Sequence, residues 1–310
     1  MPTGIQWCTE VWNPTTGCDK VSPGCGLPRF EGDDTGGCYA LAMAKRLKGM
    51  GQEKYQNDGG PRTSGPGFGI TIHPDALTVP LRWHKPRRVF VNSMSDLGHA
   101  RIPRDFLAQV WAVMAITPQH TYQILSKRPD RMRRLLASED AWRELLYAAC
   151  HWAVDLEESI PAGRFAEMRR WIYGTGNWPE VVPPLPNVHL GTSIELDRYT
   201  NRADELRETP AAVHFLSLEP LLGPLPSLDL TGINWCIIGG ESGPDARAMD
   251  LGWARDLIAQ CRDAGVAPFM KQLGSVWARD NGGGKGGDWE RWPADLRVRQ
   301  FPATPALVVT

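Results

Sequence analysis

The sequence predicts an α/β protein built as a partial or full (β/α) barrel of about six or seven parallel strands. Three observations predict this fold: short β-branched and apolar runs recur along the chain, amphipathic stretches with helical spacing lie between them, and each run ends in small or polar residues. Strands that alternate with helices form a parallel sheet, because each strand returns to the same edge through a crossover. A doubly wound open sheet fits the same pattern, since strand order cannot be read from the sequence.

Six runs have the composition of buried strands, and a weaker run near the N-terminus would open the set. The expected strands are 6–12, 88–92, 121–126, 187–193, 213–217, 234–239 and 267–271. The clearest helical patterns are 103–114 and 251–261, in which apolar residues recur at helical spacing. This alternation of strand, loop and helix is the basis for the barrel assignment.

We expect residues 1–275 to form one barrel-like domain. Its loop 12–40 carries three cysteines, and residues 59–69 are a turn-rich Gly/Pro stretch. A Trp-rich helical insertion at about 136–186, between the third and fourth strands, is either a lid beside the site or a packing appendage on the barrel wall. Residues 276–310 are expected to be an irregular C-terminal extension on the surface.

The composition is that of an ordinary soluble enzyme, with 42% hydrophobic and 22% charged residues in a chain of 310. No apolar run approaches the roughly 20 residues of a membrane helix, and the first residues lack the pattern of a signal peptide. We therefore expect a cytoplasmic protein with no membrane partner. In a reducing compartment the seven cysteines are better interpreted as metal ligands, reactive thiols or buried residues than as disulfides.

The formal net charge of −1 hides an uneven distribution. Between Arg82 and Arg134, eleven Lys/Arg against three Asp give +8, which leaves −9 for the rest of the chain. Two basic clusters, 82–88 and 127–134, provide the cations that phosphate attraction requires, and Trp83 is available for stacking. The stretch predicts nucleic acid or a nucleotide as partner, or else ordinary solvated faces.

Polar residues follow every expected strand. In a barrel the carboxyl ends of the strands share one rim, where functional residues gather. The side chains that we expect at this rim are Asp96, Lys127, Arg128, Glu195, Glu219, Glu241 and Lys271. The alternative for each of them is a solvated loop residue without a function.

Three cysteines, Cys18, Cys25 and Cys38, lie within 21 residues in a loop rich in Gly and Pro. Three thiolates can bind three irons of a cubane cluster and leave the fourth iron open, whereas a closed zinc site needs four ligands. Cys8 is a candidate fourth ligand. The spacing alone leaves iron-sulfur, zinc and no metal open. The remaining cysteines, on helix or strand patterns, are expected to be small buried residues: Cys150, Cys236 and Cys261.

Several motifs resemble those of a phage-associated three-cysteine family of unassigned function whose members look like radical S-adenosylmethionine (SAM) proteins. They are WNPTTGC, CYA, NSMSD, SKRP, SIE, LEPLLGP, GGESGPDAR and KQLG. The cysteine loop is also similar to that of spore photoproduct lyase, a DNA-repair enzyme. The resemblance implies a four-iron four-sulfur cluster on the three cysteines, SAM on the open iron, a partial barrel, a reductant protein, and a 5'-deoxyadenosyl radical that abstracts hydrogen, in repair or modification of nucleic acid or a nucleotide.

Two departures from the radical SAM pattern affect how residue roles are assigned. The last cysteine gap is lengthened by residues 26–37, and Gly239-Gly240-Glu241, whose counterpart binds the SAM amino group, follows a late strand. The resemblance then implies that SAM is bound by residues after the second strand and in the cysteine loop. These residues are Asn92, Ser93, Ser95, Asp96 and Tyr39. It suggests Glu195, Glu219 and Glu241 as catalytic carboxylates, and it suggests a substrate-binding set of Lys127, Arg128, Arg247 and Lys271.

Two other function classes compete with a radical SAM enzyme. The first is an iron-sulfur or zinc module that binds nucleic acid or a partner without chemistry. The second is a metal-dependent hydrolase that uses the rim carboxylates, with a merely structural cysteine loop. The seven histidines show no pair at metal-ligand spacing, which argues against the hydrolase.

Overall fold

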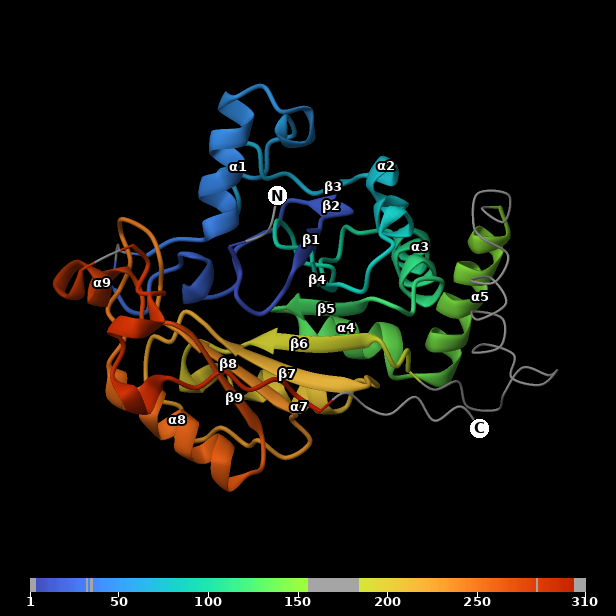
Figure 1. The fold of residues 1–310 in the computed structure, drawn as a ribbon. Coiled ribbons are helices and arrows are strands. Elements are labelled where there is room, and N and C mark those ends of the chain that lie inside the picture. The colour runs from blue at the N-terminus through green and yellow to red at the C-terminus, as the bar shows by residue number, and fades with distance from the viewer. Residues whose placement is uncertain (1–3, 32, 34–35, 156–183, 283, 304–310) are drawn as a thin grey trace.

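The computed structural model describes residues 4–31, 33, 36–155, 184–282 and 284–303. Within them, seven parallel strands form one sheet (Figure 1). Their order is β1 (Glu10–Trp12), β4 (Arg88–Val91), β5 (Thr121–Ser126), β6 (Val188–Ser193), β7 (Val213–Leu218), β8 (Trp235–Gly239) and β9 (Ala267–Gln272). All the strands expected from the sequence are confirmed, including the weak first one.

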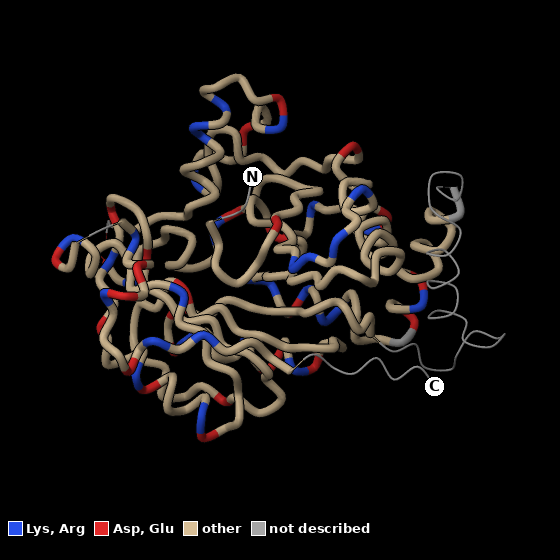
Figure 2. The backbone as a smooth tube through the Cα atoms, viewed as in Figure 1, with Lys and Arg blue, Asp and Glu red and all other residues tan. Residues whose placement is uncertain are grey.

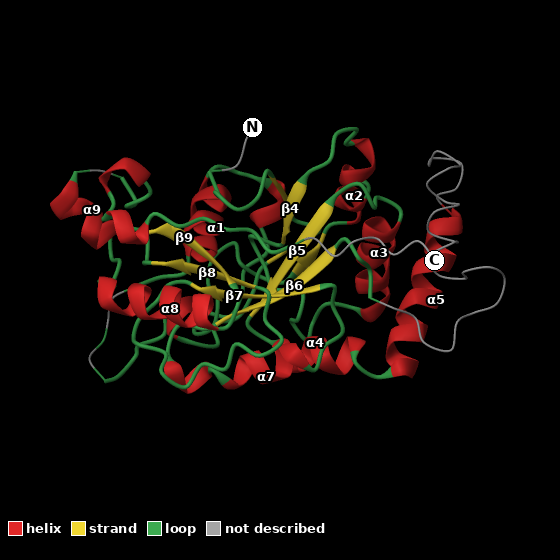
Figure 3. Cartoon of the chain, turned by 60° about the horizontal axis from the view of Figure 1, so that its bottom comes forward, coloured by secondary structure: helices red, strands yellow, loops and turns green. Residues whose placement is uncertain are grey.

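The sheet is curled and open (Figure 3), and the strand order places β1 and β9 at its two edges. Strands that are neighbours in the sheet follow one another along the chain, which is the order of a barrel and not of a doubly wound sheet. The fold is therefore a partial (β/α) barrel, and the expected fold class is confirmed. A short antiparallel pair, β2 (Thr15–Thr16) and β3 (Thr71–Ile72), lies outside this sheet.

Helices cover the convex face of the sheet (Figure 3). They are α3 (Arg104–Ala115), α4 (Pro129–Leu136), α7 (Asn201–Arg207) and α8 (Leu251–Asp263), so the two clearest helical patterns are confirmed. The core of this layer joins outward strand residues such as Val89, Ile124 and Leu216 to the helices. Asp250 begins α8 by accepting a hydrogen bond from the backbone N of Gly252 at 2.7 Å, an N-cap contact.

The concave face carries an aromatic floor. Its side chains are Trp7, Phe90, Phe215, Trp235 and Phe269, which form one buried cluster. The ring centroids of Trp7 and Phe90 are 4.6 Å apart, and those of Trp235 and Phe269 are 5.7 Å apart at nearly right angles. Gly191 is needed on this face, because a Cβ there would overlap the Phe215 ring. The interior of the half-barrel is thus filled at the level of the floor, and polar groups gather beyond the strand ends.

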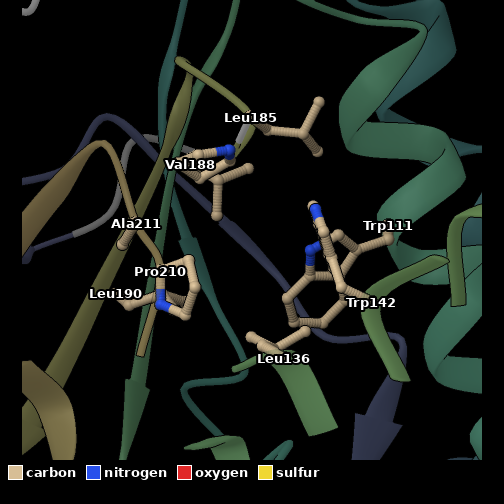
Figure 4. Close-up of a pocket in the computed structure, with 9 residues that line it drawn as sticks. Trp111, Leu136, Trp142, Leu185, Val188, Leu190, Pro210 and Ala211 are labelled. Atoms are coloured by element: carbon tan, nitrogen blue, oxygen red, sulfur yellow. The ribbon is translucent and has the colours of Figure 1, made fainter. Parts of the chain in front are cut away.

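The insertion expected at about 136–186 is described as far as α5 (Glu139–Asp155). This helix packs on α3 at the end of the molecule away from α1 (Tyr39–Gly49) (Figure 1). An apolar pocket between α3, α4, α5 and β6 includes Trp111 and Trp142 (Figure 4). The described part of the insertion is therefore a packing appendage on the barrel wall, and residues 156–183, with Trp171 and Trp178, lie outside the described residues.

The segment after residue 275 is more ordered than its composition suggests. It contains most of α9 (Ser275–Asn281), and the side chains of Trp292 and Leu296 are buried. The backbone N of Met270 donates to the carbonyl of Val298 at 2.8 Å, so this segment also covers the edge strand β9. The expectation of an irregular surface extension is corrected for its described part, because the bulky Trp and Leu side chains of this Gly-rich segment reach the core.

We expect acid to destabilise the fold through His189. This histidine is buried on β6, on the same face as Gly191, and neither ring nitrogen has a partner within the described residues. Burial lowers the pKa of His189 from 6.5 to about 4, so its neutral form is favoured in the folded state. Above pH 6.5 His189 is neutral in both states and costs no stability. Between pH 6.5 and pH 4 only the unfolded chain takes up the proton, so the free energy of unfolding should fall by roughly 3 kcal/mol.

Urea unfolding of the parent and of His189→Leu at pH 7.0 and 4.5 measures this contribution. The variant should lose less stability on acidification than the parent, whereas His84→Gln, an exposed control, should follow the parent. Equal losses in the parent and in His189→Leu would contradict the assignment.

Candidate functional site

Three thiols meet in one pocket at the carboxyl edge of the sheet. Cys18 follows β2, Cys25 ends a 3-10 turn that begins at Pro23, and Cys38 directly precedes α1. The pocket is lined by Cys18, Asp19, Lys20, Cys25, Cys38, Leu41, Thr63 and Phe68. The loop therefore folds back so that its three thiols line one pocket, beside the apolar side chains of Leu41 and Phe68.

The other cysteines do not line this pocket. Cys8 belongs to the aromatic floor beside Trp7, so the fourth ligand considered from the sequence lies elsewhere. Cys150, Cys236 and Cys261 are buried in the main hydrophobic core, as expected.

The pocket holds two of its thiols in the protonated form. Burial raises the pKa of Cys18 to about 12, with a further contribution from Asp96, although Arg128 acts in the opposite direction. Burial also raises the pKa of Cys38, reinforced by Cys25 and opposed by backbone N–H groups at the start of α1 and by Lys127. A metal or cluster that bound here would have to displace these protons, and nearby cations would balance the thiolates.

The first ion pair of the rim lies beside Cys18. Asp96 accepts hydrogen bonds from Arg128 Nη1 at 2.9 Å and from Ser126 Oγ at 2.6 Å. Arg128 Nη1 also reaches Cys18 Sγ at 3.2 Å, and its Nη2 donates to the carbonyl of Asp19 at 2.8 Å. Asp96 therefore positions Arg128, and Arg128 holds the chain at the first cysteine.

The second pair lies beside Cys25. Glu195 is fully buried, and it accepts from Arg202 Nη1 at 3.0 Å and from the backbone N of Gly24 at 3.1 Å. Lys127 lies against the same turn: a Cβ added to Gly24 would be 3.4 Å from Lys127 Cε. Burial would lower the pKa of Lys127, but Cys25 when ionised, the Glu195 carboxylate and Cys38 when ionised outweigh burial and raise the pKa. Lys127 is thus a protonated cation between the rim and the thiols.

The third pair lies beside Cys38. Arg247 donates to Glu241 from Nε at 2.8 Å and from Nη2 at 2.7 Å, and both side chains are almost completely buried. Glu241 also accepts from the backbone N of Gly37 at 3.3 Å, and Arg247 Nη2 donates to the carbonyl of Pro23 at 2.9 Å. Gly36 has φ +90°, and a Cβ there would overlap the Arg247 guanidinium. This pair clamps the lengthened segment between Cys25 and Cys38.

The fourth pair does not hold the cysteine loop. Lys271 Nζ donates to both carboxylate oxygens of Glu219, at 2.7 and 2.8 Å, and Gln272 Nε2 donates to the same carboxylate at 2.9 Å. Each rim carboxylate named from the sequence therefore has a cation of its own within the described residues.

The residues that the resemblance assigns to SAM mostly bind the chain before Cys18. Ser93 pairs with Asn13, and Ser95 pairs with Thr15. Asn92 has φ 66° and donates from Nδ2 to Thr15 Oγ1 at 2.9 Å. Its buried Oδ1 has no partner within the described residues and is the free acceptor of this set. Tyr39 is exposed beside Lys285, whose Nζ lies 5.9 Å from its ring centroid.

About half of the cations in the basic stretch are paired with carboxylates. Within the described residues, six of its eleven cations form ion pairs: Arg87 with Glu10, Arg101 with Asp19, Arg104 with Glu144, Arg128 with Asp96, Arg133 with Glu205 and Arg134 with Asp130. Figure 2 accordingly shows cationic and acidic residues interspersed along the chain. Trp83, a candidate stacking residue, carries the Arg87 guanidinium 5.2 Å from its ring centroid.

Two residues that contact the site, Arg202 and Asp19, are not among those expected from the sequence. Arg202 lies in a helix and pairs with Glu195. Asp19 accepts from His99 Nε2 at 2.9 Å and from Arg101 at 3.0 Å. The position of Asp19 directly after Cys18 is the one feature of the sequence that pointed to it.

A family model described as "Protein of unknown function (DUF5131)" matches residues 2–299. The chain belongs to this family. No curated protein and no solved structure matches the chain. Within the described part of the chain, no group of three or more His, Cys, Asp or Glu is arranged to hold a metal ion. No helix among the described residues is long and apolar enough to span a membrane.

We expect Arg247→Ala to destabilise the protein by about 3–5 kcal/mol, because it leaves the buried Glu241 carboxylate without its cation. The segment between Cys25 and Cys38 should also loosen and become cleavable by trypsin at Arg29. Urea unfolding and timed proteolysis measure the two effects. Arg255→Ala is the matched control, since its pair with Asp295 is exposed and should contribute far less. Equal stability losses in the two variants would rule out the clamp.

Proposed function

We propose that this protein is an iron-sulfur protein in which Cys18, Cys25 and Cys38 hold a four-iron four-sulfur cluster, and that it acts as a radical SAM enzyme. The observation that carries the proposal is the common pocket of the three thiols at the carboxyl edge of a partial (β/α) barrel. Three thiolates leave one iron open for a second ligand. When bound, the cluster and SAM would supply a carbon-centred radical for hydrogen abstraction.

The residues around the pocket fit such a group. Apolar side chains, Leu41 and Phe68, line its walls, while Arg128 and Lys127 supply the positive charge that three thiolates need. A cubane also differs from a single ion, because each thiolate binds a different iron and the sulfurs do not converge on one point. The chain's own contribution is to position the thiols, balance their charge and restrict water.

The acceptor that supports SAM binding is the buried Oδ1 of Asn92, which lacks a partner within the described residues. It lies at the end of β4, on the strand next to the chain that leads to Cys18. An amide oxygen in this place suits an ammonium group such as that of the methionyl moiety. Asp96 is occupied by Arg128, so we assign it to positioning and not to SAM.

As substrate we propose nucleic acid or a nucleotide, with a reductant protein as the electron donor. Support comes from exposed cations near the thiol pocket, among them Arg62, and from Lys20 in its lining. The cluster 82–88 leads into β4, which begins at Arg88, so it lies at the amino edge of the sheet and is assigned no role in substrate binding.

A second function, an iron-sulfur or zinc module without chemistry, is favoured by one observation. The carboxylates Glu195, Glu219 and Glu241 are all engaged by cations, so none of them is free to move a proton in this arrangement.

We expect anaerobically reconstituted protein to contain iron and sulfide and to show the absorption of an iron-sulfur cluster. Cys18→Ala, Cys25→Ala and Cys38→Ala should each abolish or strongly reduce iron binding, while Cys150→Ala, a buried cysteine on α5, should not. Dithionite-reduced parent should release 5'-deoxyadenosine from SAM. Zinc without iron, or full iron content in Cys38→Ala, would overturn the cluster. A stable iron-sulfur cluster without SAM cleavage would support the second function, a binding module without chemistry.

We also expect nucleic acid affinity to fall steeply from low to physiological salt, because cations that contact phosphates release counterions. The double variant Lys20→Ala with Arg62→Ala, at the thiol pocket, should lower the slope of log affinity against log salt concentration by the equivalent of about two phosphate contacts. Arg82→Ala with Lys85→Ala, exposed at the amino edge of the sheet, is the control. Fluorescence anisotropy with labelled single- and double-stranded DNA and RNA measures both. Equal affinities of all three proteins at low salt would rule out phosphate contacts by Lys20 and Arg62, and absence of binding by the parent at low salt would remove nucleic acid as the substrate.

A further inference from the structure

The pair formed by Glu219 and Lys271 differs from the other rim pairs. The pairs of Asp96, Glu195 and Glu241 each bind the cysteine loop, but no hydrogen bond of Glu219 or Lys271 within the described residues reaches it. Lys271 and Glu219 also keep 19% and 13% of their side chains exposed, against 2% and 4% for Arg247 and Glu241. The pair is thus unused by the loop and open to a ligand.

The backbone around the pair leaves room for it. Lys271 on β9 reaches Glu219, which follows β7, across the intervening strand β8. At the crossing point β8 has Gly239, where a Cβ would lie 3.2 Å from Glu219 Cδ. A glycine at this position leaves room for the Glu219 carboxyl group beside β8.

Two hydroxyl groups lie on the same face of the sheet as this ion pair, one on β7 and one on the neighbouring strand β6. Ser217 precedes Glu219 by two residues, so both point to the concave side, as Phe215 of the aromatic floor does. Its cross-strand partner in the register is Ser193 on β6. Ser193 is 1% exposed, and its Oγ has no hydrogen-bond partner within the described residues. A buried hydroxyl without a partner is costly, so this one points to a ligand group.

The hydrogen-bonding capacity left over in this region is dominated by donors. Lys271 has three N–H groups and gives two of them to Glu219, which leaves one. Ser193 and Ser217 each add an O–H donor, whereas the Glu219 carboxylate already accepts three hydrogen bonds. A cation and hydroxyl donors on one face match an oxyanion.

We propose that Lys271, Ser193 and Ser217 bind an oxyanion of the substrate, specifically the phosphate of a nucleotide, on the part of the barrel mouth away from Cys18. Glu219 is a positioning residue that holds the Lys271 ammonium over β8. The choice of phosphate rests on the nucleotide substrate of the proposed function, but the site requires neither cluster nor SAM cleavage. The carboxylate of SAM is the other oxyanion that the same donors would suit.

Isothermal titration calorimetry on the full chain, before and after cluster reconstitution, tests the site. The probes are nucleoside 5'-monophosphates, the matching nucleosides, inorganic phosphate and SAM. Monophosphates should bind about 10- to 100-fold tighter than nucleosides, and inorganic phosphate should compete with them. Lys271→Gln should remove this preference, Ser193→Ala should weaken phosphate binding about 2- to 10-fold, and Lys85→Gln, an exposed lysine at the opposite edge, should leave it unchanged.

Ser193→Ala retains the ion pair, so it keeps the test decisive if Lys271→Gln fails to fold. Equal affinity for nucleosides and monophosphates, or a phosphate preference that survives both variants, would overturn the site. Loss of SAM affinity in place of phosphate affinity would assign the oxyanion to the SAM carboxylate and also overturn it. A protein that binds no iron but retains the Lys271-dependent phosphate preference would contradict the proposed function and leave this inference standing.

Discussion

The burial of charge at the carboxyl edge of the sheet is the constraint on which the rest of the site depends. Removing a carboxylate from water costs several kcal/mol unless a cation compensates it, and Asp96, Glu195 and Glu241 are each compensated by an arginine. A guanidinium has more donors than one carboxylate can accept. The surplus donors and lone pairs bind the cysteine loop, at the carbonyls of Asp19 and Pro23 and at the N–H groups of Gly24 and Gly37.

This arrangement gives one ion pair to each cysteine. Arg128 contacts Cys18, Glu195 accepts from the residue before Cys25, and Glu241 accepts from the residue before Cys38. The loop is rich in Gly and Pro and contributes few backbone hydrogen bonds of its own, so side chains from the rigid sheet must fix it. The buried pairs therefore act as a scaffold for the thiols, a role in specifying geometry more than in adding stability.

The sequence predicts the fold and the location of the site more fully than the roles of its residues. Alternating runs locate every strand of the sheet, and parallel strands must end at one edge, so the convergence of Glu195, Glu219 and Glu241 follows. Their roles depend on partners whose positions are set by tertiary packing, such as Arg202 on α7. A charge count between Arg82 and Arg134 likewise omits the acidic partners contributed by the rest of the chain. The Gly-rich composition after residue 275 likewise did not predict that Trp292 is buried, because a single Trp is enough to anchor such a segment in the core.

Two departures of the sequence from the radical SAM pattern meet in one contact. The gap between Cys25 and Cys38 is long, and a longer loop adds closure entropy and more backbone to be held in place. The Gly-Gly-Glu motif begins at the end of the late strand β8, and its Glu241 binds this lengthened segment at Gly37, while Arg247 binds the turn before Cys25 at the carbonyl of Pro23. Gly240 allows the motif to pass close to the chain after β9, because a Cβ there would lie 2.6 Å from the carbonyl oxygen of Leu273. The longer loop and the displaced motif thus belong to one structural solution, in which the motif orders the loop. The buried Oδ1 of Asn92 at the end of β4 is then the acceptor that we propose for the cofactor amine.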